Sequence, residues 1–341
     1  MKIAVIGAGI FGITIAIRLS QAGHDVTLFE KENDVMTKVS VTNHFRHHHG
    51  YHYPRSKSTA LESINARKSF EKEYGDCLLP YFPTYYSIVK KEFGTKVTPG
   101  QYLRFCEEVG LPYKIVPVPS LINKDKVEMT LEVPERAFDP CKLKKICKEK
   151  LKKSKVRVVL NCENVSLKEF DRIINCTYAN INRTQKMLNS KQTKRQYELL
   201  ELLVLKIPGK KFGAMNMDGE YTSIIPVGRT GMYTIAHAKG SILKRIVSDN
   251  FDGDAKSFGK FKSNRRNIMK VAINDFPILK KAKYIKSIFV VKVVKADVDK
   301  TDERPSEISY HGNGIYSVFA GKVITCVNVA NKLVDIIKRK K

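Results

Sequence analysis

The sequence predicts an α/β protein of two domains, one built on a buried parallel sheet and a smaller α+β one built on an antiparallel sheet. At the start, a strand over 2–6, a glycine turn, a helix over 10–19 and a strand over 26–29 follow one another. Both strands are almost wholly apolar, which is typical of strands buried on both faces of a parallel sheet. Later segments with alternating or β-branched patterns lie at 211–225, 231–236 and 285–294. The 341 residues, 43% of them hydrophobic, are enough to bury the cores of about two domains.

Further elements follow from capping residues and periodicity. Thr98 and Pro99 begin a helix, because a side-chain cap followed by a first-turn proline favours a helix N-terminus, and Gly110 ends it. Apolar residues at three and four spacing predict an amphipathic helix over 142–155. We expect further helices at 59–74, 187–205, 239–269 and after Gly321-Lys322, and further strands at 85–89, 156–160, 172–175 and 315–319.

The formal net charge of +27 is the extreme value of the composition, and it would suit nucleic acid or an acidic membrane as a partner. The lysines are spread along the whole chain, however, and those of 142–155 form the solvated side of the expected helix. The sequence contains no zinc finger and no aromatic and basic RNA-binding motif. We therefore do not expect nucleic acid as a partner, and interpret the charge as attraction of an anionic substrate.

Cysteine usage and hydropathy indicate a cytoplasmic protein without a membrane span. The seven cysteines are scattered, odd in number and never spaced Cys-x-x-Cys, so we expect reduced thiols rather than disulfides or a zinc site. No apolar run reaches the roughly 18 residues that a spanning helix needs, since Arg18 interrupts the longest one. The first strand begins at Lys2, which leaves no room for a signal peptide ahead of it.

The glycine turn has the spacing of a dinucleotide site. Gly7, Gly9 and Gly12 form G-x-G-x-x-G between the first strand and helix, and Glu30 ends the second strand. In such Rossmann-type units the first glycine turns the chain, the second lets backbone amides approach a pyrophosphate, and the third packs helix against strand. Glu30 can accept hydrogen bonds from ribose hydroxyls and would repel a 2′-phosphate, which disfavours NADP. This unit alone does not separate FAD from NAD.

Residues 46–56, 171–179 and 304–325 resemble segments of the D-amino-acid-oxidase-like (DAO) family of FAD-dependent oxidoreductases. Residues 46–56, RHHHGYHYPRS, are similar to the His-x-Gly segment beside the flavin ring in L-2-hydroxyglutarate oxidases and glycerol-3-phosphate dehydrogenases. Residues 171–179 resemble the late strand and turn near the dinucleotide, with Cys176 and Tyr178 in place of the usual Ala and Gly. Residues 304–325 resemble the Arg-Pro and Gly-Lys segments that precede the final helix beneath the flavin.

The resemblance implies FAD as cofactor and a set of site residues. The implied FAD contacts are Gly7, Gly9, Gly12, Glu30, Arg46, His48, Gly50, Thr177, Gly321, Lys322 and Val323. The implied catalytic residues are His48, Lys322 and Arg304. Candidates for substrate binding are Tyr51, Tyr53, Arg55, Arg229, His237 and Arg304. The arginines are included because a guanidinium can bind a planar anion through two hydrogen bonds, and the tyrosines and the histidine as residues that could line the pocket.

Two of these assignments also follow from the chemistry of the residues. A helix N-terminus and a lysine at the N1 and C2 edge of a flavin favour hydride acceptance, which is the role expected of Gly321 and Lys322; a solvated lysine is the alternative. His48 could exchange protons near neutral pH. Metal binding by the histidines is disfavoured, because three consecutive residues cannot all face one ion from regular structure.

Together these observations predict a discontinuous FAD-binding domain from 1–82, 135–182 and 305–341, and a substrate domain from 83–134 and 183–304. The expected reaction removes a hydride from the carbon that bears an amine or hydroxyl of a small anionic substrate, with oxygen or another acceptor reoxidising the flavin. One alternative is a flavin enzyme without net oxidation that acts on a sugar nucleotide, like UDP-galactopyranose mutase. Another is a basic nucleic-acid or membrane-surface binding protein that keeps the nucleotide fold as a scaffold.

Overall fold

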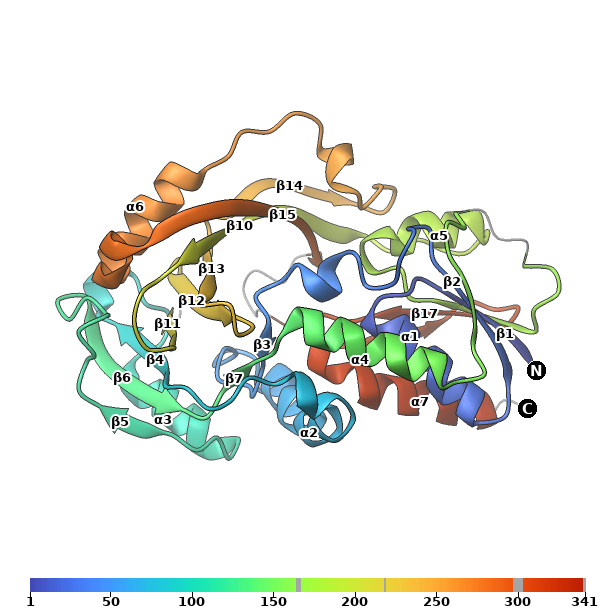
Figure 1. Ribbon diagram of the computed structural model, residues 1–341, viewed down its shortest axis with the longest axis horizontal. Helices are drawn as coiled ribbons and strands as arrows, with labels where there is room; N and C mark the ends of the chain where they lie inside the picture. Colours follow the sequence, from blue (N-terminus) through green and yellow to red (C-terminus); the bar gives the residue numbers. More distant parts are fainter. Residues whose placement is uncertain (164–166, 218, 297–302, 340–341) are drawn as a thin grey trace.

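Two sheets of different construction lie side by side in the computed structural model, which describes residues 1–163, 167–217, 219–296 and 303–339 (Figure 1). The fold class is α/β, as predicted: one sheet is mostly parallel and carries the Rossmann-type unit, and the other is mostly antiparallel. A two-stranded ribbon of β3 (Arg46–His47) and β7 (Arg136–Ala137) lies between them. No helix in the described part of the chain is both long and apolar enough to span a membrane.

The first sheet has six strands in the order β16-β17-β9-β1-β2-β8. Its strands are β1 (Lys2–Ile6), β2 (Asp25–Phe29), β8 (Arg157–Val159), β9 (Arg172–Asn175), β16 (Glu307–Tyr310) and β17 (Ile315–Phe319). All neighbours are parallel except β16 and β17. Because β1 is central, the loop that follows it opens at the carboxyl edge of the sheet, where ligands of open parallel sheets bind.

Helices cover both faces of this sheet. One face packs against α1 (Ile10–Gln21), α4 (Pro140–Lys152) and α7 (Cys326–Arg339), with α2 (Lys57–Tyr74) beside them (Figure 1). The shared core holds apolar residues of all four helices, among them Ile13, Phe70, Leu143 and Leu333. The opposite face carries α5 (Ile181–Met187) and a smaller cluster around Ile173. Burial on both faces explains why these strands are nearly all apolar.

The second sheet has nine strands, in the order β14-β10-β13-β12-β11-β4-β6-β5 with β15 also paired to β10. Its strands are β4 (Thr84–Val89), β5 (Lys114–Val116), β6 (Val127–Val133), β10 (Arg195–Lys206), β11 (Gly213–Met217), β12 (Thr222–Val227), β13 (Met232–His237), β14 (Ile242–Ser248) and β15 (Lys283–Lys295). α3 (Pro99–Glu108) packs against one face and α6 (Arg265–Asp275) against the other. The short 3₁₀ helices are Val39–Val41, Gly75–Cys77, Lys91–Phe93, Tyr178–Asn180, Ala255–Phe258, Pro277–Lys281 and Val323–Thr325.

Two expected helices are wrong. In place of a helix over 187–205 the chain forms β10, and in place of one over 239–269 it forms β14 and only then α6. Glu198 and Glu201 stand three residues apart among leucines, which imitates the polar side of an amphipathic helix. Both carboxylates are instead buried on opposite faces of a strand, each with its own partners. Strand pairing with β14 and β15 therefore overrides the local pattern.

Candidate active site

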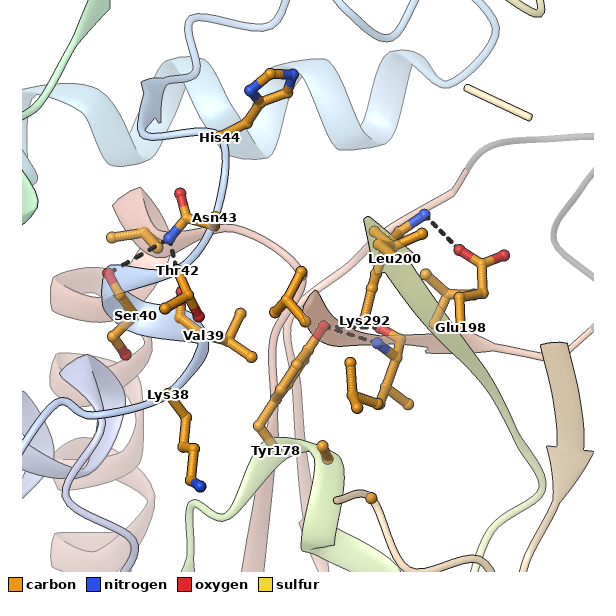
Figure 2. Close-up of a pocket in the computed structure, with 18 of the residues that line it drawn as sticks. Lys38, Val39, Ser40, Thr42, Asn43, His44, Tyr178, Glu198, Leu200 and Lys292 are labelled. Carbon is orange, nitrogen blue, oxygen red and sulfur yellow. Dashed lines mark hydrogen bonds and ion pairs between the residues drawn. The ribbon is translucent and has the colours of Figure 1, made fainter. Parts of the chain in front are cut away.

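A cavity of about 1120 Å³ runs from the glycine turn of the first sheet to the inner face of the second. Its lining includes Gly7, Gly9 and Glu30 at one end, and Met215 of β11 and Ser223 of β12 at the other. Figure 2 shows part of it, with the 38–44 loop on one side and Tyr178, Glu198, Leu200 and Lys292 across from it. A long molecule could thus contact both sheets at once.

The glycine turn leaves no room for side chains. Gly7 has φ +99°, and a Cβ on Gly12 would lie 1.9 Å from the Gly7 carbonyl oxygen. The loop's own donors are held by side chains: Ala8 N–H donates to Glu30 Oε2 at 2.7 Å, and Ile10 N–H donates to Ser40 Oγ at 3.1 Å. Glu30 therefore lies directly against the turn, where the sequence predicted it, and Ser40 is a neighbour that the sequence did not reveal.

The Gly321-Lys322 segment lies at the cavity together with Arg304. Lys322 Nζ is buried, 2.6 Å from Glu62 Oε2, and donates to the Arg304 carbonyl oxygen at 3.0 Å. It also lies 5.4 Å from the centroid of the Tyr53 ring. The lysine is neither solvated nor an uncompensated cation, because the Glu62 carboxylate offsets its charge.

His48 presents a neutral imidazole to the cavity. Burial lowers the pKa of His48 well below its usual value, and the nearby charges of Arg46, His52, Lys322 and Arg304 lower it further. Within the described residues, the buried Nδ1 atom of His48 has no hydrogen-bond partner, and neither has Nε of Arg46. Arg46 is itself buried, with Nη1 3.3 Å from the Tyr86 hydroxyl oxygen. A bound molecule with an acceptor and a polar hydrogen would satisfy both orphaned atoms.

His44 is a cavity residue that the sequence analysis missed. Its Nδ1 lies 2.7 Å from Thr234 Oγ1 and its Nε2 lies 2.7 Å from Ser223 Oγ, so it links the 38–44 loop to β12 and β13. Burial lowers the pKa of His44 to about 3, so its imidazole is neutral. Both partners lie more than 170 residues away in sequence, so no local pattern could have revealed the contact.

Comparison with known families gives a match that covers most of the chain. Residues 2–284 match the DAO model, described as FAD dependent oxidoreductase. The chain belongs to this family. FAD is therefore its cofactor, and the chain is an FAD-dependent oxidoreductase, which excludes a mere scaffold role for the nucleotide fold.

Related sequences and structures share the fold at low identity. The chain is similar to the FAD-dependent monooxygenase FPY4 of Fusarium mangiferae, with 23% identity over 98% of this chain and 91% of that protein. Among solved structures, L-α-glycerophosphate oxidase from Mycoplasma pneumoniae with FAD bound has a TM-score of 0.75 at 14% identity, covering 99% of this chain and 94% of that one. L-proline dehydrogenase from P. horikoshii has a TM-score of 0.74 at 15% identity, covering 100% and 94% respectively.

The residues of this flavoenzyme fit the cofactor. Gly7 and Gly9 line the cavity at the N-terminus of α1, where the absence of side chains would leave space for a pyrophosphate. Glu30 lines the same end of the cavity and would hold the ribose. Thr177, Gly321, Lys322 and Val323 also line the cavity. Tyr178 departs from the usual glycine: it takes φ +49° and its hydroxyl oxygen accepts from Val293 N–H at 2.9 Å. The turn that contains Tyr178 therefore contacts β15 of the second sheet, where a glycine would leave space.

Several predicted site residues lie away from the cavity lining. Gly12 and Gly50 pack against backbone, at Gly7 and Ala60 respectively. Tyr51 is buried and its hydroxyl donates to the Pro112 carbonyl oxygen. Tyr53 is buried beneath Lys322, and Arg229 is exposed in the β12–β13 turn, outside the lining.

Arg55 and His237 do line the cavity. His237 stands at its rim, where its Nδ1 accepts a hydrogen bond from Gly240 N–H at 2.8 Å. His47 and His49 point elsewhere, toward Glu71, and their ligand atoms lie within 4.8 Å of one another. Arg67 approaches both His49 and Glu71, and its charge opposes cation binding there. The expectation that the protein holds no metal remains a prediction.

Proposed function

We propose that this flavoenzyme oxidises a small anionic substrate at the carbon that bears its amine or hydroxyl. The observation that carries the proposal is the group of cations around the neutral His48: Arg46, Arg304, Lys322 and His52 all contribute positive potential at its ring. Two carboxylates lie near this group: Glu62, 2.6 Å from Lys322 Nζ, and the buried Glu135, which interacts with Arg46. A site with this excess of positive charge binds carboxylate or phosphate more strongly than a neutral group.

The chain's own residues would bind and orient the substrate. FAD supplies the hydride acceptor when bound. Arg304 lines the cavity directly beside Gly321, since a Cβ added to Gly321 would lie only 3.1 Å from Arg304 Cβ. Its guanidinium can fork onto the anion while His48 Nδ1 accepts the hydrogen bond of the amine or hydroxyl. An anion bound between these cations would also raise the proton affinity of His48, which would help it to take up the substrate proton.

A panel of substrates tests this function directly. The yellow protein is mixed anaerobically with amino acids, 2-hydroxy acids, glycerol phosphate and sugar nucleotides while the flavin absorbance is followed. We expect bleaching by a compound with an anionic group and an oxidisable amine or hydroxyl. A neutral compound as the best reductant would refute the anionic site. Turnover of a sugar nucleotide without any electron acceptor would instead establish chemistry without net oxidation.

We also infer the division into domains and the location of the protein. The strands of the parallel sheet come from residues 1–82, 135–182 and 305–341, which supports assigning these segments to the FAD-binding domain. Residues 83–134 and 183–304 supply the antiparallel sheet and would form the substrate domain.

Seven free cysteines agree with a cytoplasmic location. Limited proteolysis with and without FAD, and cell fractionation, would test the two proposals.

A further inference from the structure

One end of α6 and the neighbouring part of β15 form a surface in which basic and apolar side chains alternate. This basic-apolar patch consists of Phe261, Arg265, Arg266, Ile285, Lys286 and Phe289. Its three apolar side chains are exposed, with exposed fractions of 37% for Phe261, 41% for Ile285 and 39% for Phe289. Figure 1 shows α6 and β15 along the upper left of the molecule, above and to the left of α4 and α7.

Contacts among the side chains of the patch and its neighbours hold them in place. The rings of Phe261 and Phe289 lie 5.1 Å apart between centroids, which ties the segment before α6 to β15. The Arg265 guanidinium lies 4.4 Å from the centroid of the Tyr284 ring. A shallow groove runs between these elements, lined mostly by the patch residues and by the polar side chains at the start of α6. Phe289 lines both this groove and the large cavity, so the patch adjoins the active site.

The net positive charge per residue is higher around the patch than the average over the whole chain. Residues 255–295 carry twelve lysines and arginines and one acidic residue, so they hold +11 of the net +27. The one acid, Asp275, is buried and bonded to Lys126 at 2.9 Å, so it neutralises none of the exposed cations. Within the described residues, Arg265, Arg266 and Lys286 form no ion pair.

The other lysine-rich surface of the protein behaves differently. Along α4, Lys144 and Lys148 pair with Asp34 at 3.0 and 2.8 Å, and Lys150 pairs with Glu73 at 2.7 Å. Its apolar side chains point into the core. Lys144, Lys148 and Lys150 of α4 thus have intramolecular partners and its apolar side chains are covered, whereas the three patch cations form no ion pair with described residues and surround exposed apolar side chains.

We infer that the basic-apolar patch docks the enzyme on an anionic lipid surface. Cations draw a protein to anionic headgroups, and apolar side chains among them can enter the boundary between headgroups and acyl chains. Phosphates of a nucleic acid would satisfy the cations but would leave the exposed surfaces of Ile285 and the two phenylalanines in water. Docking in this way would hold the cavity at the lipid surface through Phe289. The inference concerns the surface alone and does not depend on the proposed substrate.

Vesicle binding tests the charges. FAD-loaded protein is sedimented with vesicles of phosphatidylcholine alone, or of phosphatidylcholine and phosphatidylserine in about a 7:3 ratio. We expect binding only to the second kind, weakening as salt is added. The triple variant R265E/R266E/K286E should lose at least about tenfold in vesicle affinity, while its FAD content stays unchanged. The matched control K142E/K153E/K155E changes three exposed lysines on or just after α4 that form no ion pair with any described residue, and it lowers the net charge equally.

The outcomes separate a specific surface from general attraction. Equal losses in the two triple variants would overturn the inference, because the net charge alone would then explain binding. Absence of binding to the anionic vesicles would overturn it as well. A double-stranded DNA fragment that binds more tightly than the vesicles, and that needs the same three residues, would assign the patch to nucleic acid instead.

The apolar part can be tested with a fluorescent reporter, because the chain contains no tryptophan. In Phe261→Trp the single indole should shift its emission to shorter wavelength on anionic vesicles and be quenched by brominated lipid acyl chains. Val158→Trp, on the β8 edge of the other sheet, places an indole at a residue of similar exposure, 36%, and should show neither change. An unshifted Phe261→Trp emission on vesicles that bind the protein would show that the patch does not insert.

Discussion

The two sheets of this enzyme meet at one cavity, yet they are specified by the sequence in different ways. In the parallel sheet, backbone geometry at a few positions decides the structure: φ +99° at Gly7 and the contact of Gly12 with Gly7 admit only glycine. In the antiparallel sheet, side chains far apart in sequence decide it, as in the contacts of Glu198 with Arg245 and Lys292. The comparison teaches that a cofactor site can be found from local spacing, whereas a substrate wall depends on distant pairs.

The largest effect should come from the glycine turn. In Gly12→Ala the new Cβ would overlap the Gly7 carbonyl oxygen, so α1 cannot pack against the turn and FAD retention should be lost. Gly100→Ala in α3 is the matched control, because no atom lies within 4 Å of its added Cβ. The flavin-to-protein absorbance ratio measures the effect. Full flavin content in Gly12→Ala would mean that the turn tolerates side chains and that the contrast between the sheets is false.

The next effect concerns the wall where the two sheets meet. Arg304→Lys removes the forked guanidinium beside Gly321, so KM for an anionic substrate should rise by about 30-fold or more, roughly 2 kcal/mol, with FAD content intact. Arg229→Lys, exposed in the β12–β13 turn, should leave KM unchanged. Steady-state kinetics with the best substrate of the panel would measure both. If the two variants behave alike, the anion is held elsewhere in the cavity.

A third change tests whether the antiparallel sheet depends on its buried carboxylate. The Glu198 side chain is 3% exposed and lies 3.0 Å from both Lys292 Nζ and Arg245 Nη2, and its pKa is lowered despite burial because of these cations. Glu198→Gln would remove the negative charge that both cations face and should lower the free energy of unfolding by about 2 kcal/mol. This is below the cost at a fully buried pair, because both cations are partly exposed. Glu149→Gln on α4 is the exposed control, and urea unfolding should show almost no change for it.

Sequence reasoning thus recovered the parallel sheet and the cofactor, but only part of the cavity lining that the second sheet supplies. It placed Gly7, Gly9, Glu30, Gly321 and Lys322 at the cavity because each belongs to a short segment with a fixed backbone role. It predicted a helix where the structure has β10. The reason is that Glu198 and Glu201 stand three residues apart among leucines, a spacing typical of an amphipathic helix. It overlooked His44 and the Glu62 partner of Lys322, since both contacts join segments that are remote along the chain.

The partner of Lys322 changes the size of a fourth effect. Lys322→Met should lower the flavin reduction potential and slow flavin reduction by about tenfold at most, because Glu62 already offsets part of the lysine charge. Adding Glu62→Gln should restore part of the potential, since the double variant removes both charges. Dye-linked potentiometry and stopped-flow reduction measure the two quantities. A potential that stays at the parent value in Lys322→Met would show that the ion pair is electrostatically silent at the flavin.

A fifth effect is a pH dependence that joins the two regions at His44. Burial holds the pKa of His44 at about 3 in the folded protein, against 6.5 for an ordinary histidine. Between these values the unfolded chain binds a proton that the folded chain does not, so the contribution of His44 to stability is complete above about pH 6.5 and is lost as the pH falls toward 3.

A single proton of this kind gives a slope of at most about 1.4 kcal/mol per pH unit in the free energy of unfolding. His44→Asn should therefore lower stability at pH 7, where its hydrogen bonds with Thr234 and Ser223 are lost, and should flatten the decline between pH 6 and pH 4 by about that slope. Urea unfolding across this range compares the variant with the parent, so that the titration of carboxylates common to both cancels. Burial also lowers the pKa of His311, but that ring is less enclosed, and His311→Asn should flatten the decline less. Parallel pH profiles for the parent and His44→Asn would mean that His44 is protonated in the folded enzyme, and its hydroxyl partners on β12 and β13 would then both have to accept hydrogen bonds from it.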